Sequence, residues 1–289
     1  MERCFLCPRR CGADRDKISG FCGGGNRLKI AKIMVHYGEE PVISGTRGSG
    51  AVFFSGCNLR CVYCQNAPIS KDGRGKFFTE AEFTDAVLAL CDKGVHNIDL
   101  ITAGHYVSLL APLLEKLKPR ISVPVIYNSS GYEYASALKM LDGLVDVYLP
   151  DFKYYDDNLA AKYSAAPDYR ETAEKAVEEM LRQCGKPIVE NGIIKRGVII
   201  RHLVLPGSRS DSINVIRLIA EKFGDAAVSI MRQYTPVFNR SQFSELNRSI
   251  TSFEYDSVVK EAVKCGLKGF TQIKGCETKD YTPDFNEIY

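Results

Sequence analysis

The residues of this chain best suited to chemistry are three cysteines at C-x3-C-x2-C spacing, Cys57, Cys61 and Cys64. They follow an apolar run at 51–54 that is typical of a buried β-strand. Thiolates are soft ligands, and such short spacings let one loop hold three sulfurs around a single iron–sulfur cluster. A 4Fe–4S cluster with three protein thiolates keeps one iron open, as catalytic metal sites keep an open position. A zinc knuckle would need a fourth ligand at knuckle spacing, and none follows before Cys91, so we expect a catalytic loop.

A second group of four cysteines lies near the start of the chain, at C-x2-C-x3-C-x10-C spacing. Glycines surround its last member, and a glycine beside a ligating cysteine lets the backbone turn tightly and bring N–H groups toward the sulfur. Four cysteines in so short a span indicate a metal site. A closed tetrahedral zinc and a second 4Fe–4S cluster both satisfy the spacing. The predicted ligands are Cys4, Cys7, Cys11 and Cys22.

The central loop, Cys-Asn-Leu-Arg-Cys-Val-Tyr-Cys with Tyr63 before its third cysteine, resembles the signature of radical S-adenosylmethionine (radical SAM) enzymes. Its flanks at 55–56 and 65–66 are similar to the pyruvate formate-lyase activating enzyme. The resemblance implies that the amino and carboxylate groups of SAM bind the open iron. Reduction of the cluster would then split SAM into methionine and a 5′-deoxyadenosyl radical, which abstracts a hydrogen atom. The Cys-Pro-Arg-Arg-Cys at 7–11 resembles an uncharacterised branch of activating-enzyme-like proteins.

Strand-like and helix-like patterns alternate after residue 50, which is typical of βα units around a parallel sheet. Before them, a short β-hairpin is expected at 27–43 around the turn signal Gly-Glu-Glu-Pro. A capping box of Thr79 and Glu82 predicts a helix start. We expect strands at 51–55, 98–102, 123–128, 145–150, 198–205, 228–234 and 269–273, with helices at 79–93, 107–118, 134–141, within 156–184, at 211–223 and at 255–265.

Six of these units match the partial (β/α)6 barrel of the resembled family. We therefore predict an α/β fold with two parts. The first is a Cys-rich metal-binding extension with a β-hairpin over residues 1–48, and the second is a radical SAM (β/α)6 core with a C-terminal helix and strand over residues 49–289.

Barrels built from βα units collect their chemistry in the loops after the C-terminal ends of the strands, and polar residues stand at these positions here. Hydroxyl and amide groups suit hydrogen bonds to a ribose or a carboxylate. A guanidinium within an apolar strand would be costly without an anionic partner. The candidates are Gly104 after the second strand, Asn128, Ser129 and Ser130 after the third, Asp151 and Lys153 after the fourth, and Arg201 and His202 on the fifth.

The resemblance assigns these candidates to the SAM pocket. Gly104 stands where the family has a Gly-Gly-Glu sequence whose backbone accepts the SAM amino group, although the acidic residue is missing here. The stretch 128–130 resembles a Thr-Asn-Gly segment that lies against SAM. Lys153 would meet the SAM carboxylate, and Asp151 would help to hold a monovalent cation. Arg201 or His202 would line the cofactor pocket.

The composition of the 289 residues sets outer bounds on function. A net charge of +3 gives no strong signal for nucleic acid, and no apolar run is long enough to span a membrane. Eleven cysteines in a chain without a secretory signal indicate metal ligation in a reducing cytoplasm rather than disulfides. An anaerobic setting fits, because an exposed cluster is sensitive to oxygen. Cys91, Cys184 and Cys265 fall in helical patterns and are expected to be small core residues.

Three functions remain in view. The first is a radical SAM oxidoreductase that receives electrons from a flavodoxin- or ferredoxin-like donor. By resemblance, it would take a hydrogen atom from a glycine of a partner glycyl radical enzyme, because an open six-stranded barrel would admit a peptide loop. The second applies the same radical to a small molecule or a peptide. The third is an iron–sulfur electron-transfer protein without catalysis, which the missing fourth ligand of the central loop opposes.

Overall fold

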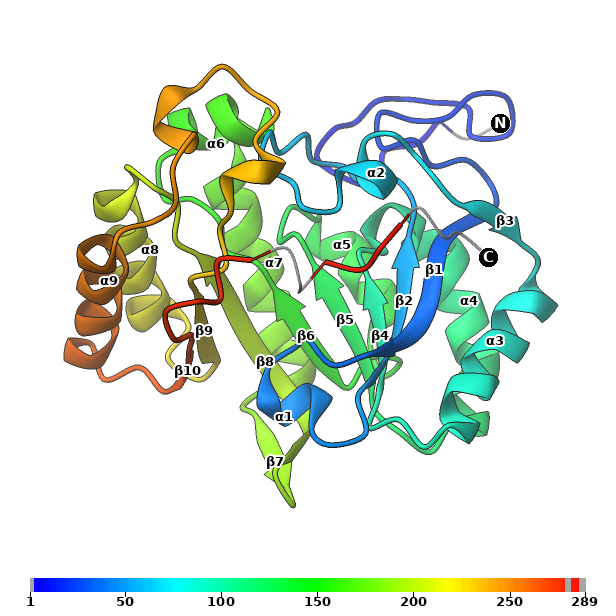
Figure 1. Ribbon diagram of the computed structural model, residues 1–289. Coiled ribbons are helices and arrows are strands. Elements are labelled where there is room, and N and C mark those ends of the chain that lie inside the picture. Colours follow the sequence, from blue (N-terminus) through cyan, green and yellow to red (C-terminus); the bar gives the residue numbers. More distant parts are fainter. Residues whose placement is uncertain (1–2, 279–281, 286–289) are drawn as a thin grey trace.

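The structure is a computed structural model that describes residues 3–278 and 282–285. Within these residues the strands form one ten-stranded sheet in the order β10-β9-β8-β6-β5-β4-β2-β1-β3, with β7 beside β8 (Figure 1). The strands are β1 (Leu28–His36), β2 (Ser49–Phe54), β3 (Lys76–Phe78), β4 (Ile98–Ile101), β5 (Val125–Ser129), β6 (Val147–Pro150), β7 (Ile188–Glu190), β8 (Ile193–Leu203), β9 (Ala227–Met231) and β10 (Gly269–Thr271). The helices are α1 (Pro41–Ser44), α2 (Ala67–Ser70), α3 (Glu80–Asp92), α4 (Val107–Leu117), α5 (Ala135–Leu138), α6 (Asp157–Ser164), α7 (Tyr169–Cys184), α8 (Arg209–Lys222) and α9 (Ser252–Lys264).

Six neighbouring strands, β2, β4, β5, β6, β8 and β9, run parallel, and β10 adds a seventh parallel strand. Every residue of β2, β4, β5 and β6 is buried, as expected for parallel strands covered on both faces. The predicted α/β fold is confirmed. The sheet is not closed, because β10 and β3 form its two edges, and this matches a partial barrel.

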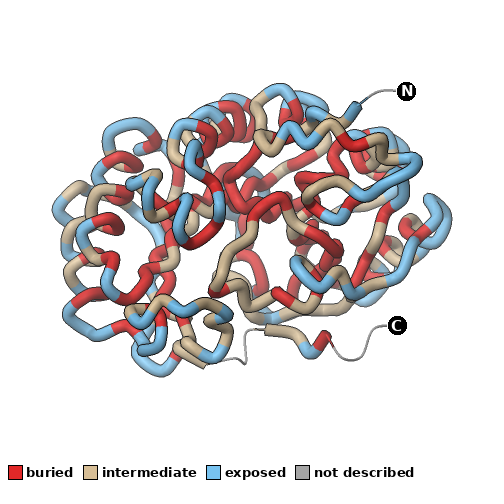
Figure 2. Tube along the Cα trace, turned by 90° about the horizontal axis from the view of Figure 1, so that it is seen from above, coloured by how far each residue is buried: buried red, intermediate tan, exposed pale blue. Residues whose placement is uncertain are grey.

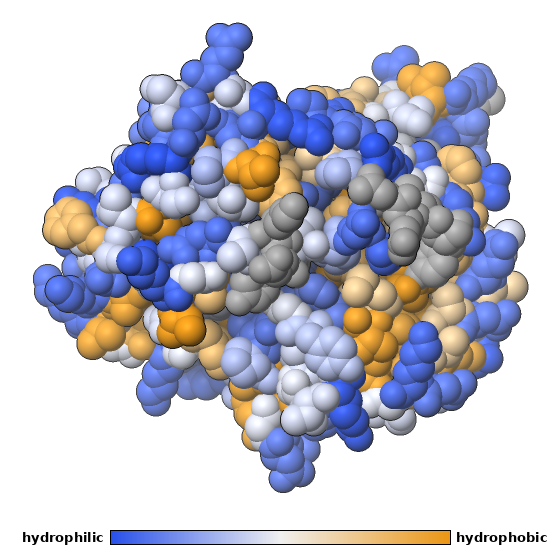
Figure 3. All heavy atoms as spheres, in the orientation of Figure 1, coloured by the Kyte–Doolittle hydropathy of each residue, from blue (hydrophilic) through white to orange (hydrophobic). Residues whose placement is uncertain are grey.

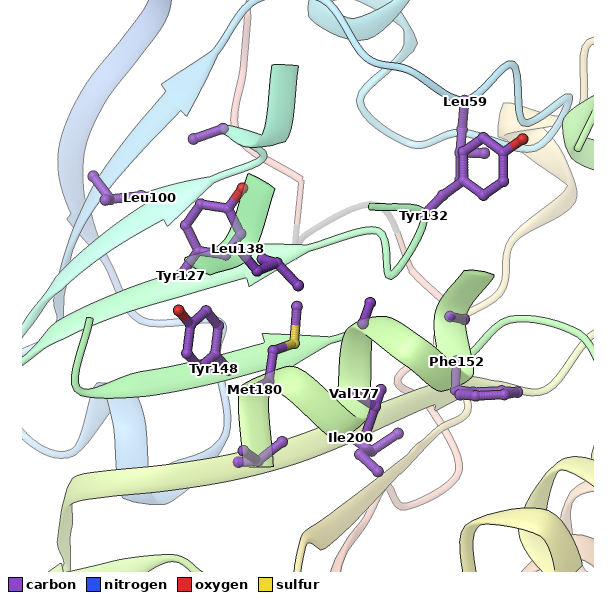
Figure 4. Packing of buried hydrophobic residues seen from close by; sticks show 14 of the residues in the cluster. Leu59, Leu100, Tyr127, Tyr132, Leu138, Tyr148, Phe152, Val177, Met180 and Ile200 are labelled. Carbon is purple, nitrogen blue, oxygen red and sulfur yellow. The ribbon is translucent and has the colours of Figure 1, made fainter. Parts of the chain in front are cut away.

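Helices pack on the outer face of this sheet. Figure 4 shows α7 laid against the strands, with Met180 and Val177 directed toward Tyr148 and Ile200. The predicted capping box of α3 is present, since the Thr79 side chain accepts from the Glu82 N–H and the Glu82 carboxylate accepts from the Thr79 N–H. The covering helices hold the strands so that their C-terminal ends share one rim.

Among the described residues, no helix has the length and apolar character to cross a bilayer.

The expected hairpin at 27–43 is wrong. The segment forms one long strand, β1, which pairs antiparallel with β2 on one side and with β3 on the other. Leu28, Ile30 and Ala31 of β1 are buried, and the strand pairs with β2 and β3 instead of folding back on itself, so the local turn signal did not decide the pairing. The Gly-Glu-Glu-Pro sequence instead leads into α1, whose first residue is its proline, Pro41.

Strands β7 and β8 form a hairpin that was not predicted from the sequence. Its turn is Asn191-Gly192, where both residues have positive φ, as the favoured two-residue hairpin turns require. The expected strand at 198–205 therefore begins earlier, at Ile193, and ends at Leu203.

Both ends of the described chain return to the C-terminal rim of the sheet. Residues 3–27 contain no helix or strand and lie near α2, above the strand ends (Figure 1). Figure 2 looks down on the molecule from above and shows buried residues gathered in its middle, with exposed residues mostly at the periphery. At the other end, Phe285 packs edge-to-face on Phe53 of β2, with 5.5 Å between ring centroids. The boundary predicted between residues 48 and 49 stays a prediction, and β1 joins the two parts in one sheet.

Candidate active site

The central cysteine loop begins where β2 ends. Gly56 has φ of +90°, a conformation that favours glycine, and turns the chain from the strand into the loop. Cys57, Cys61 and Cys64 then line one cavity at the C-terminal ends of the parallel strands. The sequence placed these thiols on one loop, and the structure brings all three to one space.

Hydrogen bonds position the three sulfurs. The Leu59 N–H lies 3.4 Å from the Cys57 sulfur and donates to it. The Cys61 sulfur is 2.9 Å from the Ser164 hydroxyl, and the Cys64 sulfur is 3.3 Å from the Ser70 hydroxyl. Contacts of this kind orient ligands and tune a bound iron–sulfur cluster.

The loop is also fixed from outside. The Asn58 amide donates to the Tyr132 carbonyl at 2.6 Å, and the Val62 N–H donates to the Tyr163 carbonyl at 2.9 Å. Figure 4 shows Leu59 directed toward the Tyr132 ring. These bonds tie the loop to the segments after β5 and β6, so the thiols are held by elements distant in sequence.

Charged side chains from three strand ends face the same cavity. Lys153 pairs with Asp151 at 2.7 Å, and Arg201 lies 2.9 Å from Glu39 and 2.5 Å from the Asn128 side-chain oxygen. Burial alone would raise the pKa of Asp151, but Lys153 and Arg201 lower it below its usual value. The structure therefore offers both cations and hydrogen-bonding groups to an anionic ligand beside the cysteine loop.

Beneath these charges the barrel interior is acidic. Burial raises the pKa of Glu39 to about 7 despite its contact with Arg201. Burial, reinforced by Glu39, also raises the pKa of Asp99. The side chain of Asn128 opposes this rise in the pKa of Asp99 without cancelling it. Neither acid was predicted from the sequence, although an aspartate inside the apolar strand at 98–102 was a signal for Asp99.

Most of the predicted pocket residues line the cavity, and three do not. Those in the wall are Tyr63, Asn128, Ser130, Asp151, Lys153 and Arg201. His202 lies behind the wall, where one ring nitrogen is 2.7 Å from the Phe152 carbonyl and burial lowers its pKa to about 4. Ser129 turns its hydroxyl to the Glu133 carboxylate.

Gly104 also lies behind the cavity wall, and its neighbour is unexpected. A Cβ atom on Gly104 would lie only 2.7 Å from the Glu133 side-chain carboxyl carbon. Tyr127 donates to that carboxylate at 2.7 Å. An acidic side chain thus lies beside Gly104 although none follows it in the sequence, and no local pattern in the sequence could reveal this neighbour.

The four N-terminal cysteines lie beside this site. Cys7 and Cys22 are buried, Cys4 is partly buried and Cys11 is exposed. The Gly24 N–H donates to the Cys22 sulfur at 3.3 Å. A Cβ atom on Gly20 would lie 3.3 Å from the Cys11 sulfur and 3.6 Å from the Cys22 sulfur. The glycines thus allow the close approach that the sequence predicted.

The central thiols fit a 4Fe–4S cluster. Burial raises the pKa of Cys57 to about 12, so its thiolate is costly without a cation, and iron would supply the positive charge. Among the described residues, no three metal-binding side chains converge on a single ion. A cubane cluster does not require such convergence, because each thiolate binds a different iron. It requires thiols that face one shared space, as these three do.

Comparisons with known proteins agree with this geometry. The family model "Radical SAM superfamily" matches residues 51–219, more than half of the chain. An uncharacterised protein of Methanocaldococcus jannaschii is 28% identical over 283 residues, covering 92% of this chain and 76% of the relative. The 7-carboxy-7-deazaguanine synthase of Methanothermobacter thermautotrophicus is 32% identical over 137 residues, covering 46% of this chain and 53% of that enzyme.

Solved structures share the fold. SuiB of Streptococcus suis, bound to its precursor peptide SuiA, superposes with a TM-score of 0.53 at 13% identity over 76% of this chain. HydG, a maturase of the [FeFe]-hydrogenase, superposes with a TM-score of 0.51 at 13% identity over 74% of this chain. The chain spans about half the length of these two proteins, 47% and 48%. The chain belongs to the radical SAM superfamily, which implies that it uses a 4Fe–4S cluster and S-adenosylmethionine.

Proposed function

We propose that this protein is an activating enzyme of the pyruvate formate-lyase activating type, which generates a radical on a glycine of a partner protein. The bound cluster and SAM would supply a 5′-deoxyadenosyl radical, which takes one hydrogen atom from the glycine α-carbon. The observation that carries the proposal is the convergence of Cys57, Cys61 and Cys64 with Lys153 and Arg201 on one cavity. Soft ligands for iron and cations for a carboxylate thus face the same space.

Different residues of the cavity wall would bind different groups of SAM. Lys153 would bind the SAM carboxylate, because its ion pair with Asp151 keeps it charged within the cavity. Asp151 would also help to hold a monovalent cation. Asn128 and Ser130 would donate to the ribose or the carboxylate. Tyr63 would fix the cysteine loop, since its hydroxyl lies 2.5 Å from that of Tyr154.

One wall residue, Arg201, and three predicted residues behind the wall would hold the site in shape. Arg201 is held by Glu39, Asn128 and Asp151 and would keep the wall in place. His202, Ser129 and Gly104 would support the strand ends through the contacts described above. The open edge of the sheet supports a macromolecular substrate, because a peptide loop needs a path into the barrel. A flavodoxin- or ferredoxin-like protein in a reducing cytoplasm would supply the electron.

Isotope transfer tests this function directly. The anaerobically reconstituted protein is mixed with SAM, reduced flavodoxin and a candidate glycyl radical enzyme whose glycines carry α-deuterium. We expect deuterium in 5′-deoxyadenosine and a glycyl radical signal in the partner. Formation of unlabelled 5′-deoxyadenosine alone would remove the activating role and leave radical SAM chemistry intact. Absence of 5′-deoxyadenosine would favour an electron-transfer protein without catalysis.

A second candidate function is radical modification of a small molecule or a peptide. The 32% identity to 7-carboxy-7-deazaguanine synthase over 137 residues favours it. The partly buried Glu39 and the fully buried Asp99 favour it as well, because they would suit a substrate that carries hydrogen-bond donors or a positive charge into the barrel. Transfer of deuterium from a labelled small amine rather than from a protein glycine would select this alternative.

A further inference from the structure

The N-terminal cysteine segment, residues 4–22, connects the protein surface to the central cysteine loop. Cys11 is exposed at one end of the segment, and Cys22 is buried at the other. The Cys22 carbonyl accepts a hydrogen bond of 3.0 Å from the Cys57 N–H. With standard bond lengths, this bond puts the sulfurs of Cys22 and Cys57 within about 11 Å of each other. Electron tunnelling weakens exponentially with distance. This short separation of the two sulfurs therefore favours electron transfer between them.

The segment is fixed in this position. A Cβ atom on Gly56 would lie 2.3 Å from the Cys22 carbonyl oxygen, so only glycine allows the two backbones to approach. Arg60 of the central loop donates to the Phe21 carbonyl. From the other side, Arg9 donates to the Asn58 carbonyl at 2.6 Å, and its guanidinium lies 4.4 Å from the centre of the Phe21 ring. Side chains of both the N-terminal segment and the central loop therefore hold the two together.

The geometry of the thiols favours iron–sulfur over zinc. A tetrahedral zinc site needs four ligand atoms about 2.0–2.3 Å from one point. In the part of the chain that the structure describes, no three thiols converge in that way, either at the N-terminal segment or in the central loop. Sulfurs that lie near one another without meeting at one point suit a cubane, whose irons each bind one thiolate. At the N-terminal segment, the Cβ position of Gly20 is 3.3 Å from the Cys11 sulfur and 3.6 Å from the Cys22 sulfur. Backbone donation to the sulfur, from Gly24 to Cys22 and from Leu59 to Cys57, occurs in both places.

The surface around the N-terminal cysteines carries the positive charge of the protein. Residues 1–30 contain seven Lys or Arg against three Asp or Glu, whereas the whole chain has a net charge of only +3. Arg3, Arg10 and Lys17 are exposed there. Phe5 and Ile18 are also exposed, by 52% and 61%. Figure 3 shows hydrophilic atoms with a small hydrophobic group at the upper right, the corner where Figure 1 places this segment.

We propose that Cys4, Cys7, Cys11 and Cys22 bind a 4Fe–4S cluster that is the electron entry site of the protein. An acidic one-electron carrier protein docks on the basic surface and reduces this site. The electron then passes along the Cys22–Cys57 contact to the central loop. One electron leaves the donor for each SAM that is cleaved, and the sulfonium carbon–sulfur bond takes up that electron. The inference rests on the proposed radical SAM function, and its test is separate from that function.

Metal analysis tests the identity of the site. Wild type, Cys11→Ser and the control Cys91→Ser, whose cysteine lies in α3, are reconstituted anaerobically. We expect about eight iron and eight sulfide in wild type and Cys91→Ser. Cys11→Ser should keep the sulfide and lose about one iron, because the missing thiolate holds one iron of the N-terminal cubane. Electron paramagnetic resonance of the reduced wild type should show two interacting clusters, and the signal of the N-terminal cluster should change in Cys11→Ser. Four iron and one zinc in wild type would overturn the proposal.

Reduction kinetics test the electron path. Stopped-flow absorbance follows reduction of each protein by flavodoxin hydroquinone and by dithionite, with neither SAM nor substrate present. We expect Cys11→Ser to be reduced at least about tenfold more slowly by flavodoxin than wild type, while dithionite reduces both at similar rates. Lys17→Glu, which leaves every cysteine in place, should slow reduction by flavodoxin only at low salt, because salt screens surface charges.

The outcomes separate this inference from the proposed function. Equal rates for Cys11→Ser and wild type with flavodoxin would overturn the entry site, even if 5′-deoxyadenosine forms. A fully reduced two-cluster wild type that yields no 5′-deoxyadenosine would overturn the proposed function and leave the entry site standing. Circular dichroism of Cys11→Ser checks folding, and Cys4→Ser, whose cysteine is only partly buried, repeats the measurement at a second ligand.

Discussion

The two cysteine groups of this protein lie side by side in opposite surroundings. Cys57, Cys61 and Cys64 face a cavity whose wall includes Asp151 and Lys153. The N-terminal group meets glycines and the protein surface, and its Cys22 borders a smaller cavity at the junction. The difference teaches that a group of thiols becomes a candidate active site through the polar residues that neighbouring strand ends bring to it, since both groups have suitable spacing.

The number of ligands gives the same contrast. Three cysteines leave one iron of a cubane for another molecule, and four would close every iron. The open position belongs where a cavity can admit a ligand, and the closed one belongs where only electrons need to pass. The variants below test whether the two regions differ in this way.

The largest effect is expected from the central loop. Cys61→Ala removes a thiol that lines the cavity and should lower SAM cleavage by at least about a thousandfold, as loss of a group essential to the chemistry does. Production of 5′-deoxyadenosine with dithionite as reductant measures the loss, and Cys91→Ala is the matched control. Cleavage by Cys61→Ala within tenfold of wild type would show that the central loop is not the site of catalysis.

The next effect concerns the cavity wall. Lys153→Met removes the cation proposed to bind the SAM carboxylate, and a hydrogen bond to a charged group contributes about 1.5–3 kcal/mol. The dissociation constant for SAM should therefore rise about 10- to 100-fold in equilibrium binding to the reconstituted protein. Lys162→Met is the control, because Lys162 forms an ion pair with Glu245 and does not line the cavity. Equal loss of affinity in both variants would argue against a specific contact.

Sequence alone predicted the parts of the site that rest on short-range patterns. The cysteine loop has its own spacing, and parallel strands place their C-terminal ends on one rim. Consequently Asn128, Asp151, Lys153 and Arg201, although up to 73 residues apart, could be assigned to one place. The order of strands and helices followed from alternating apolar patterns for the same reason.

The contacts that sequence could not predict join remote segments without a local signal. Glu39 was interpreted as part of a hairpin turn, yet it reaches Arg201 at 2.9 Å because β1 pairs along β2. Glu133 faces Gly104 because the loops after β4 and β5 are neighbours. The Cys22–Cys57 hydrogen bond likewise depends on where the N-terminal segment docks, which its metal-binding pattern does not specify.

A smaller effect, on stability, is expected where the two regions meet. Gly56→Ala would force a Cβ atom to 2.3 Å from the Cys22 carbonyl oxygen at a φ of +90°, so it should lower the free energy of unfolding by about 3 kcal/mol. Gly73→Ala is a matched control, because its φ is +67° and nothing lies within 4 Å of the added atom, so only the backbone cost of about 1–2 kcal/mol applies. Denaturant unfolding compares the two variants. Equal losses would mean that the N-terminal segment does not pack tightly on the central loop.

The smallest effect is a pH dependence set by the acidic interior of the barrel, which has no counterpart in the N-terminal segment. Burial raises the pKa of Glu39 from 4.5 to about 7, although Arg201 opposes the shift and Glu40 and Asp151 add to it. Between these pH values the folded state binds more protons than the unfolded state. The contribution of Glu39 to stability is therefore fully present below pH 4.5 and is lost as the pH rises through 7.

Glu39→Gln replaces the carboxyl group, which gains and loses a proton, by an amide of the same shape that does not titrate. The free energy of unfolding of wild type, measured relative to that of Glu39→Gln, should fall as the pH rises from 4.5 to 7. Denaturant titrations at several pH values give this difference, and the other titratable groups cancel where the substitution does not disturb them. Glu80→Gln is the control, because Glu80 is exposed and pairs with Lys116 on the surface. If this difference in the free energy of unfolding stays flat or rises with pH, Arg201 keeps Glu39 ionised. The part of the cavity that Glu39 lines would then carry its negative charge at neutral pH.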